Sequence, residues 1–300
     1  IHMLERKGDE VGTIKFFGNN SNRRRRDEIP SDNMIARLEA EIAPPTGQIA
    51  LVFTDIKNST FLWETMPEEA MRSAIKSHNN IMRRHLRNIG GYEVKTEGDA
   101  FMVSFPTVAS ALLWCFTVQI ELLKADWPKE IIASEDGKEI CYEHDKEVIY
   151  KGLSVRMGIH CGTPVFELDI VTKRMDYFGP MVNRAARICN AADGGQICVS
   201  SDVESEISGF MHGGSGSKNI GDDEEVQGPS NNAVDKNVIT LNKMGVIIKK
   251  IGEKKLKGLE NAEILSLVFP ERLKGRLEKD VIILPIIVTF ISLFCFQSRI

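Results

Sequence analysis

The sequence predicts an α+β domain with a ferredoxin-like βαββαβ core followed by extra α and β elements. Two observations support this: strand-like and helix-like segments alternate in that order, and a glycine-centred hairpin lies in the middle of the pattern. The 300 residues are 42% hydrophobic and 27% charged, which excludes a disordered chain or a collagen-like fibre. We expect an antiparallel or mixed sheet with helices mainly on one face, which leaves the other face free to meet a partner.

The first half of the core is read from four consecutive segments. Gln48–Phe53 is apolar and rich in β-formers, which indicates a buried strand. Apolar residues from Pro67 to Ile89 recur at helical spacing. Tyr92–Thr96 and Ala100–Phe105 are strand-like, and Gly98 between them predicts a hairpin.

The second half begins with Val108–Leu123, which is apolar on almost every side and therefore predicts a buried helix. The later elements are expected as a strand at Leu153–His160, a helix at Pro180–Ala191, and strands at Gln196–Val199, Ile247–Ile251 and Ile264–Phe269.

Polar composition predicts the limits of the domain. Residues 1–46 are expected to be a linker with one short helix, and residues 47–270 the folded domain. Within it, residues 212–238 are rich in Gly, Ser, Asn and acids, which predicts a flexible insertion. Arg23–Arg26 is either part of a solvated linker or a basic patch for a membrane or nucleic acid, and the acids that follow at once favour the linker.

Residues 271–300 are expected to form a charged and then apolar tail outside the domain. Its uncharged run, 281–296, is shorter than the roughly 20 residues that a membrane span needs. The run is either an anchor or an artefact of the gene model. The sequence opens on Ile1, which predicts a fragment of a longer protein.

The net charge and the cysteine content indicate which partners and which cellular compartment the protein has. Lys and Arg number 38 against 42 Asp and Glu, a net charge of −4, which argues against a nucleic-acid binder. The six cysteines lie far apart without CxxC pairs, as expected of reduced thiols. We therefore expect a cytoplasmic protein, with peripheral attachment to a membrane left open.

Two aspartates are the candidates for metal chemistry. Asp55 ends the first strand and Asp99 lies at the hairpin tip, so their carboxylates converge if these strands are neighbours. Hard cations such as Mg²⁺ prefer carboxylate oxygens, and two metals can clamp a phosphoryl centre. The alternative is that Asp55 caps the next segment and Asp99 only makes a turn. His160 is interpreted as a structural residue rather than a base, and no P-loop or GxGxxG motif occurs.

Five motifs in this order resemble the class III nucleotidyl cyclase catalytic domain, most closely that of fungal adenylate cyclases. They are FTDIKNST (53–60), YEVKTEGDAFMVSFP (92–106), LSVRMGIHCG (153–162), MDYFGPMVNRAAR (175–187) and KLKGLE (255–260). The resemblance covers about residues 47–270.

The resemblance implies roles for nine residues. These are metal binding by Asp55, Asp99 and the backbone carbonyl of Ile56; adenine binding by Lys95 and Asp176; catalysis by Asn183 and Arg187; and phosphate binding by Arg156 and Lys257. A lysine can donate to the adenine ring and a carboxylate can accept from its amine, so the pair fits ATP.

The resemblance also implies an activity and partners. These are conversion of ATP to cyclic AMP with two Mg²⁺ ions per site (Mn²⁺ can substitute), in a homodimer whose two active sites are shared between subunits. A Ras-type GTPase and a cyclase-associated protein are further implied partners, and no nucleic acid is implied. The alternatives are a guanylate cyclase, a non-enzymatic cyclase-homology module and a polymerase-like palm domain, which would need a basic template channel that the sequence lacks.

Overall fold

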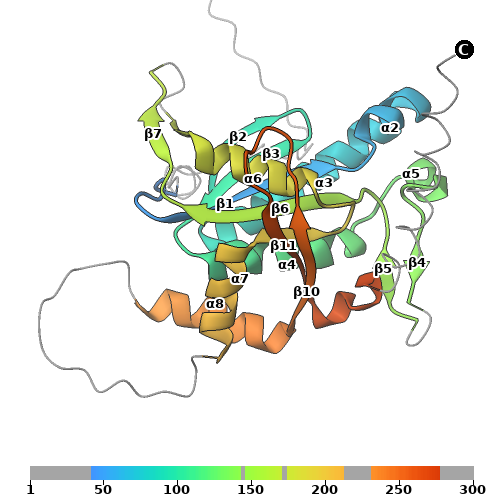
Figure 1. The fold of residues 1–300 in the computed structure, drawn as a ribbon. Helices are drawn as coiled ribbons and strands as arrows, with labels where there is room; N and C mark the ends of the chain where they lie inside the picture. The colour runs from blue at the N-terminus through green and yellow to red at the C-terminus, as the bar shows by residue number, and fades with distance from the viewer. Residues whose placement is uncertain (1–41, 143–145, 171–173, 213–230, 278–300) are drawn as a thin grey trace, which may run out of the picture. The chain divides into compact units, whose positions relative to one another are not determined.

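A computed structural model describes residues 42–142, 146–170, 174–212 and 231–277 of the chain (Figure 1). The predicted linker up to residue 41, the centre of the predicted insertion (213–230) and the tail from residue 278, with its apolar run, lie outside the described residues.

The described elements follow one another along the chain as β1 (Ile49–Ile56), α2 (Ser59–Thr65), α3 (Glu68–Ile89), β2 (Tyr92–Glu97), β3 (Ala100–Phe105), α4 (Val108–Lys124), α5 (Lys129–Ala133), β4 (Ile140–Cys141), β5 (Val148–Tyr150), β6 (Val155–Gly162), β7 (Val165–Leu168), β8 (Met175–Phe178), α6 (Pro180–Asn190), β9 (Ile197–Ser200), α7 (Ser201–His212), α8 (Asn231–Met244), β10 (Val246–Lys254), β11 (Glu263–Pro270) and the 3₁₀ helix η2 (Glu271–Leu273).

Among the described residues, seven strands form one sheet in the order β10-β11-β9-β6-β1-β3-β2. β1 pairs antiparallel with both β3 and β6, and β2 pairs antiparallel with β3. This is the strand order of a ferredoxin-like core, so the predicted fold class is confirmed. β6 and β9 pair parallel, which makes the sheet mixed.

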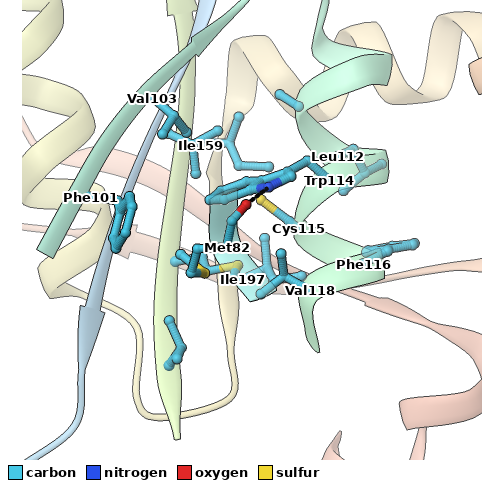
Figure 2. Packing of buried hydrophobic residues seen from close by; sticks show 14 of the residues in the cluster. Met82, Phe101, Val103, Leu112, Trp114, Cys115, Phe116, Val118, Ile159 and Ile197 are labelled. Carbon is cyan, nitrogen blue, oxygen red and sulfur yellow. Dashed lines mark hydrogen bonds between the residues drawn. The ribbon is translucent and has the colours of Figure 1, made fainter. Parts of the chain in front are cut away.

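One face of the sheet carries the larger core. Ala50 and Val52 of β1 point into it, and α3 and α4 cover it. Helix α4 is buried on nearly all sides because α3, α7 and α8 also pack against it. Figure 2 shows the side chain of Trp114 inside this core, where its indole N–H donates to the carbonyl of Met82 at 3.3 Å. The bond satisfies the indole's only polar group, which would otherwise be costly to bury.

The opposite face is not free, contrary to the sequence prediction. Ile49 and Leu51, which alternate with the residues above, pack against Met181 and Ala185 of α6. Figure 1 shows α6 lying over β1 and β6, in agreement with its contacts to both strands. Helix α6 is amphipathic, and the sheet is the surface on which its apolar side is buried.

Two glycines are required by close packing and by turn geometry. Gly98 has φ of +64° at the tip of the β2–β3 hairpin, a conformation that side chains rarely adopt. A Cβ on Gly158 of β6 would lie 2.2 Å from the backbone nitrogen of Cys189, so only glycine lets the end of α6 approach the sheet.

Two segments differ from the sequence prediction. Residues 231–238 of the predicted flexible insertion belong to α8, whose Leu241 is fully buried against the core. Residues 271–277 of the predicted tail also belong to the fold, since Leu273 and Arg276 are buried. Polar composition does not reveal these segments, because in the described part of each only one to three buried residues lie among exposed or half-buried ones.

The described residues also bear on chemistry and location. No described helix is both long and apolar enough to cross a membrane. The five described cysteines are free, as the sequence predicts, and only Cys141 is exposed. Burial raises the pKa of Cys189 to about 12, and the pKa of Cys161 and Cys198 likewise to about 12, so these thiols are poor nucleophiles at neutral pH.

The docking of α8 is tested by Leu241→Ala. Removing this fully buried side chain should lower the free energy of unfolding by about 2–4 kcal/mol, because a cavity remains in the core. The matched control is Ile239→Ala on the same helix, where the side chain is 51% exposed and the change should be below about 1 kcal/mol. Urea unfolding followed by circular dichroism measures both, and equal losses would show that α8 does not dock as described.

Candidate nucleotide and metal site

The two predicted metal-binding aspartates lie at the same end of β1. Asp55 is the next-to-last residue of β1, and Asp99 follows the hairpin tip beside it. The backbone N–H of Ile56 donates to Asp99 Oδ2 at 3.3 Å, which brings the second carboxylate to the residue after Asp55. The structure therefore brings together Asp55, Ile56 and Asp99 across 43 residues of sequence.

Arg156 faces this acidic pair. It stands directly opposite Asp55 in the β1–β6 register, and its Nε donates to Asp55 Oδ2 at 2.9 Å. Both side chains are about 30% exposed, so the guanidinium is accessible from solvent while it partners the carboxylate. The sequence prediction assigned Arg156 to phosphate and missed this ion pair, which follows from strand register alone.

Lys95 and Asp176, predicted to bind adenine, contact one another. Lys95 Nζ lies 2.8 Å from Asp176 Oδ2, although 81 residues separate them. Tyr92 holds their two strands together, because its hydroxyl accepts from the backbone N–H of Met175 at 2.9 Å. Lys95 Nζ also lies 5.7 Å from the centroid of the Phe178 ring, within the range of a cation–π contact.

Asn183 and Arg187, predicted to be catalytic, are both exposed on one side of α6, four residues apart. Pro180 begins the helix, a position that needs no N–H donor. Arg184 anchors the helix to β11 by an ion pair with Glu263 at 2.9 Å. The helix thus presents one polar side to solvent while the other is fixed on the sheet.

Lys257, predicted to bind phosphate, is exposed in the connection between β10 and β11. The neighbouring Leu256 is buried in a cluster that contains Ile188 of α6. The connection is therefore packed against the same helix that carries Asn183 and Arg187.

The predicted residues form separate groups within one chain. Among the residues that the structure describes, no hydrogen bond or ion pair joins the Asp55–Asp99 group to the Lys95–Asp176 pair. Sequence reasoning also missed the β7–β8 ribbon, whose strands are four residues long and too short for a reliable alternation. This ribbon carries Asp176 and exposes several apolar side chains, namely Val165, Phe166, Leu168 and Phe178.

Asp55, Asp99 and the carbonyl of Ile56 supply only some of the oxygen ligands that a hard divalent cation requires. In the described part of the chain, no three His, Cys, Asp or Glu side chains cluster as a complete metal site. Two carboxylates with a backbone carbonyl match the way Mg²⁺ is held, by one or two carboxylates together with substrate phosphates. The chain is thus an α+β domain with two carboxylates and a backbone carbonyl close together at one end of β1.

Comparison with known proteins identifies the family. Residues 42–256 match the adenylate and guanylate cyclase catalytic domain. The adenylate cyclase of Mycosarcoma maydis is 56% identical over 272 residues, which is 86% of this chain and 11% of that protein. The adenylate cyclase of Schizosaccharomyces pombe is 51% identical over 279 residues, 93% of this chain and 16% of that protein. The chain thus spans between 11% and 16% of the length of these two relatives.

A solved structure of adenylate cyclases from Trypanosoma brucei in their monomeric state has the same fold. It is 25% identical, with a TM-score of 0.56, and the match covers 77% of this chain and 93% of that one. This chain therefore belongs to the adenylate and guanylate cyclase catalytic domain family, as the sequence motifs predict. Members of this family depend on metal ions for activity.

His160 is buried, which favours the structural role that the sequence predicts for it, and this role can be tested by pH. Burial lowers its pKa to about 4, with Arg184 acting in the same direction and Asp202 against it. Its Nδ1 is hydrogen-bonded to Ser200 Oγ at 2.9 Å. Below pH 6.5 His160 takes up a proton in the unfolded chain but stays neutral in the folded chain. The free energy of unfolding therefore decreases as the pH falls from 6.5 toward 4.

The variant His160→Gln should therefore lose less stability than the parent between pH 7 and pH 5, by about 2 kcal/mol. Urea unfolding at the two pH values measures the difference. Parallel losses in both proteins would mean that His160 takes up a proton in the folded state.

Proposed function

We propose that this chain carries the catalytic domain of an adenylate cyclase, which converts ATP to 3′,5′-cyclic AMP and pyrophosphate. The observation that carries the proposal is the contact between Lys95 and Asp176 at 2.8 Å. A lysine donor beside a carboxylate acceptor complements the ring nitrogens and the amine of adenine, whereas guanine presents a carbonyl in place of the amine. The identity to fungal proteins named adenylate cyclase supports the same substrate.

Each predicted residue has a part in this reaction. Asp55, Asp99 and the carbonyl of Ile56 would hold two Mg²⁺ ions, for which Mn²⁺ could substitute. When bound, these ions supply the positive charge that activates the ribose 3′-hydroxyl and neutralises the triphosphate. Arg156 and Lys257 bind the phosphates.

Asn183 orients the ribose while its 3′-oxygen bonds to the α-phosphorus and the bond from that phosphorus to the β-phosphate oxygen breaks. Arg187 stabilises the charge that develops on the α-phosphate. The proton of the 3′-hydroxyl passes to solvent water, because no side chain of this domain is assigned to accept it. Catalysis then depends on positioning and electrostatics.

The active form is a homodimer in which each site is shared. Asp55, Asp99 and Arg156 would come from one subunit, and the remaining side chains from the other. The exposed apolar side chains of the β7–β8 ribbon support this, because burying them against a second copy of the chain would be favourable. A two-fold axis would create two equivalent sites.

For the longer protein, we propose regulation by a Ras-type GTPase and a cyclase-associated protein, and a cytoplasmic location that allows peripheral contact with a membrane. These proposals rest on the resemblance to fungal adenylate cyclases.

The activity is tested by cyclic-nucleotide production from the full 300-residue chain with Mg²⁺ or Mn²⁺, ATP against GTP. We expect cyclic AMP from ATP, with specific activity that rises with protein concentration. The variant Lys95→Glu with Asp176→Cys should shift the preference toward GTP by at least about tenfold, because the base-reading hydrogen bonds are exchanged. Cyclic GMP from the parent chain would indicate a guanylate cyclase, and a folded dimer without product would indicate a non-enzymatic module.

The shared site is tested by mixing two inactive variants. Asp99→Ala and Asn183→Ala should each lower activity by about 100-fold or more. In an equal mixture half of the dimers are mixed, and one of their two sites is intact, so about one quarter of the parent activity should return. The matched control mixes Asp99→Ala with Asp55→Ala, whose lesions fall in the same half of the site, and should not recover. Recovery in the control, or none in the test, would count against a shared site.

A further inference from the structure

The chain turns back on itself after its last strand and buries a charged side chain. Residues 271–277 pack beside β5 (Figure 1, red), where Leu273 is fully buried and Arg276 is 2% exposed. The Arg276 guanidinium donates to the carbonyl of Ile149 at 2.7 Å and stacks on Tyr150, 4.6 Å from its ring centroid. A buried cation that makes such contacts is held in one place.

Two further hydrogen bonds of Arg276 connect it, through Gln119 and Gly195, to the start of β6. The guanidinium donates to Gln119 Oε1 and to the carbonyl of Gly195, each at 2.6 Å. Gln119 in turn donates to the carbonyl of Val155 at 2.8 Å, and the N–H of Gly195 donates to that carbonyl at 3.0 Å. Arg276 therefore fixes both donors that hold the first residue of β6.

The residues around Val155 in β6 lie beside the end of β1 that carries Asp55 and Ile56. Val155 is paired with Ile56 in the β1–β6 register, and the next residue, Arg156, partners Asp55. The N–H of Lys57 donates to the carbonyl of Ser154 at 2.9 Å.

The loop that ends in Gly195 also contacts Lys57, which directly follows β1. Lys57 Nζ forms an ion pair with Asp193 at 2.8 Å. Gly194 packs so closely that a Cβ on it would lie 2.8 Å from Lys57 Cδ. Both ends of the 193–195 segment are thus fixed, one by Lys57 and the other by Arg276.

We propose that Arg276 is a positioning residue for the metal end of the site. It acts through hydrogen bonds to Gln119 and Gly195, which both bind Val155. These bonds hold β6 and the 193–195 segment in the positions that keep Asp55 and Ile56 in place. The kinetic part of this inference rests on the proposed cyclase activity, and the structural part does not.

The test uses the full chain with Arg276→Lys and Arg276→Met. The lysine variant keeps the charge and can reach only part of the acceptor set, whereas the methionine variant keeps an unbranched apolar stem and removes the guanidinium donors. The matched control is Leu273→Ala, which weakens the packing of the same segment without touching the hydrogen bonds. Melting temperatures identify a common temperature at which all variants are folded.

The first readout is amide hydrogen exchange, which needs no activity. Peptides that cover residues 55–57, 154–157 and 193–196 should exchange at least fivefold faster in Arg276→Met, with an intermediate effect in Arg276→Lys. Peptides from β2 and β3 should be unchanged. The Leu273→Ala control should speed exchange in 271–277 and leave the other three regions at the parent rate.

The second readout is the Mn²⁺ concentration that gives half-maximal cyclic AMP formation. It should rise at least fivefold in Arg276→Met, while KM for ATP at saturating Mn²⁺ changes less than twofold. If the parent chain makes no cyclic nucleotide, the proposed function fails and the exchange data still decide the structural part. Unchanged exchange near Val155 in both Arg276 variants, or the same pattern in Leu273→Ala, would overturn the proposal.

Discussion

The antiparallel pairing of β1 with β6 is the interaction on which the rest of the structure depends. It places Asp55 opposite Arg156 and Ile56 opposite Val155. The same register sends alternate β1 side chains to opposite faces, where Val52 meets α4's side of the core and Leu51 meets α6's side. Because side chains alternate along a strand, a slip of one residue would exchange the two faces and separate the ion pair. Core packing and site geometry are therefore specified by one set of backbone bonds.

The elements that the sequence predicts well are those whose own residues carry the signal. Helix α3 has apolar residues at helical spacing over 22 residues, and Gly98 predicts the turn of the β2–β3 hairpin. Helix α8 does not, because its burial depends on Leu241 meeting a core built from distant elements. The 271–277 segment is hidden for the same reason. What decides its structure is a set of hydrogen-bond acceptors 81 to 157 residues away, which no local pattern contains.

The candidate site divides in the same way. The sequence brings Asp55 and Asp99 together only on the condition that the first strand lies beside the hairpin, and the structure meets that condition by pairing β1 with β3. The sequence does not bring Lys95 and Asp176 together, because the ribbon that carries Asp176 is too short to be recognised by its periodicity. Only the resemblance to a family supplied that pair. The contact between Arg156 and Asp55 needs a register, and a register comes from the packing of the whole sheet.

The position of Arg276 has a consequence for the order in which the domain is made. A ribosome delivers the chain from its N-terminus, so every strand of the sheet leaves the exit tunnel before this arginine does. A nascent chain that has reached Pro270 already contains each residue assigned to metal, base or phosphate, yet Gln119 and Gly195 still lack their common donor. Among the described residues, the last buried charge is therefore synthesised after the last strand of the sheet, so these hydrogen bonds form only when all seven strands have been made.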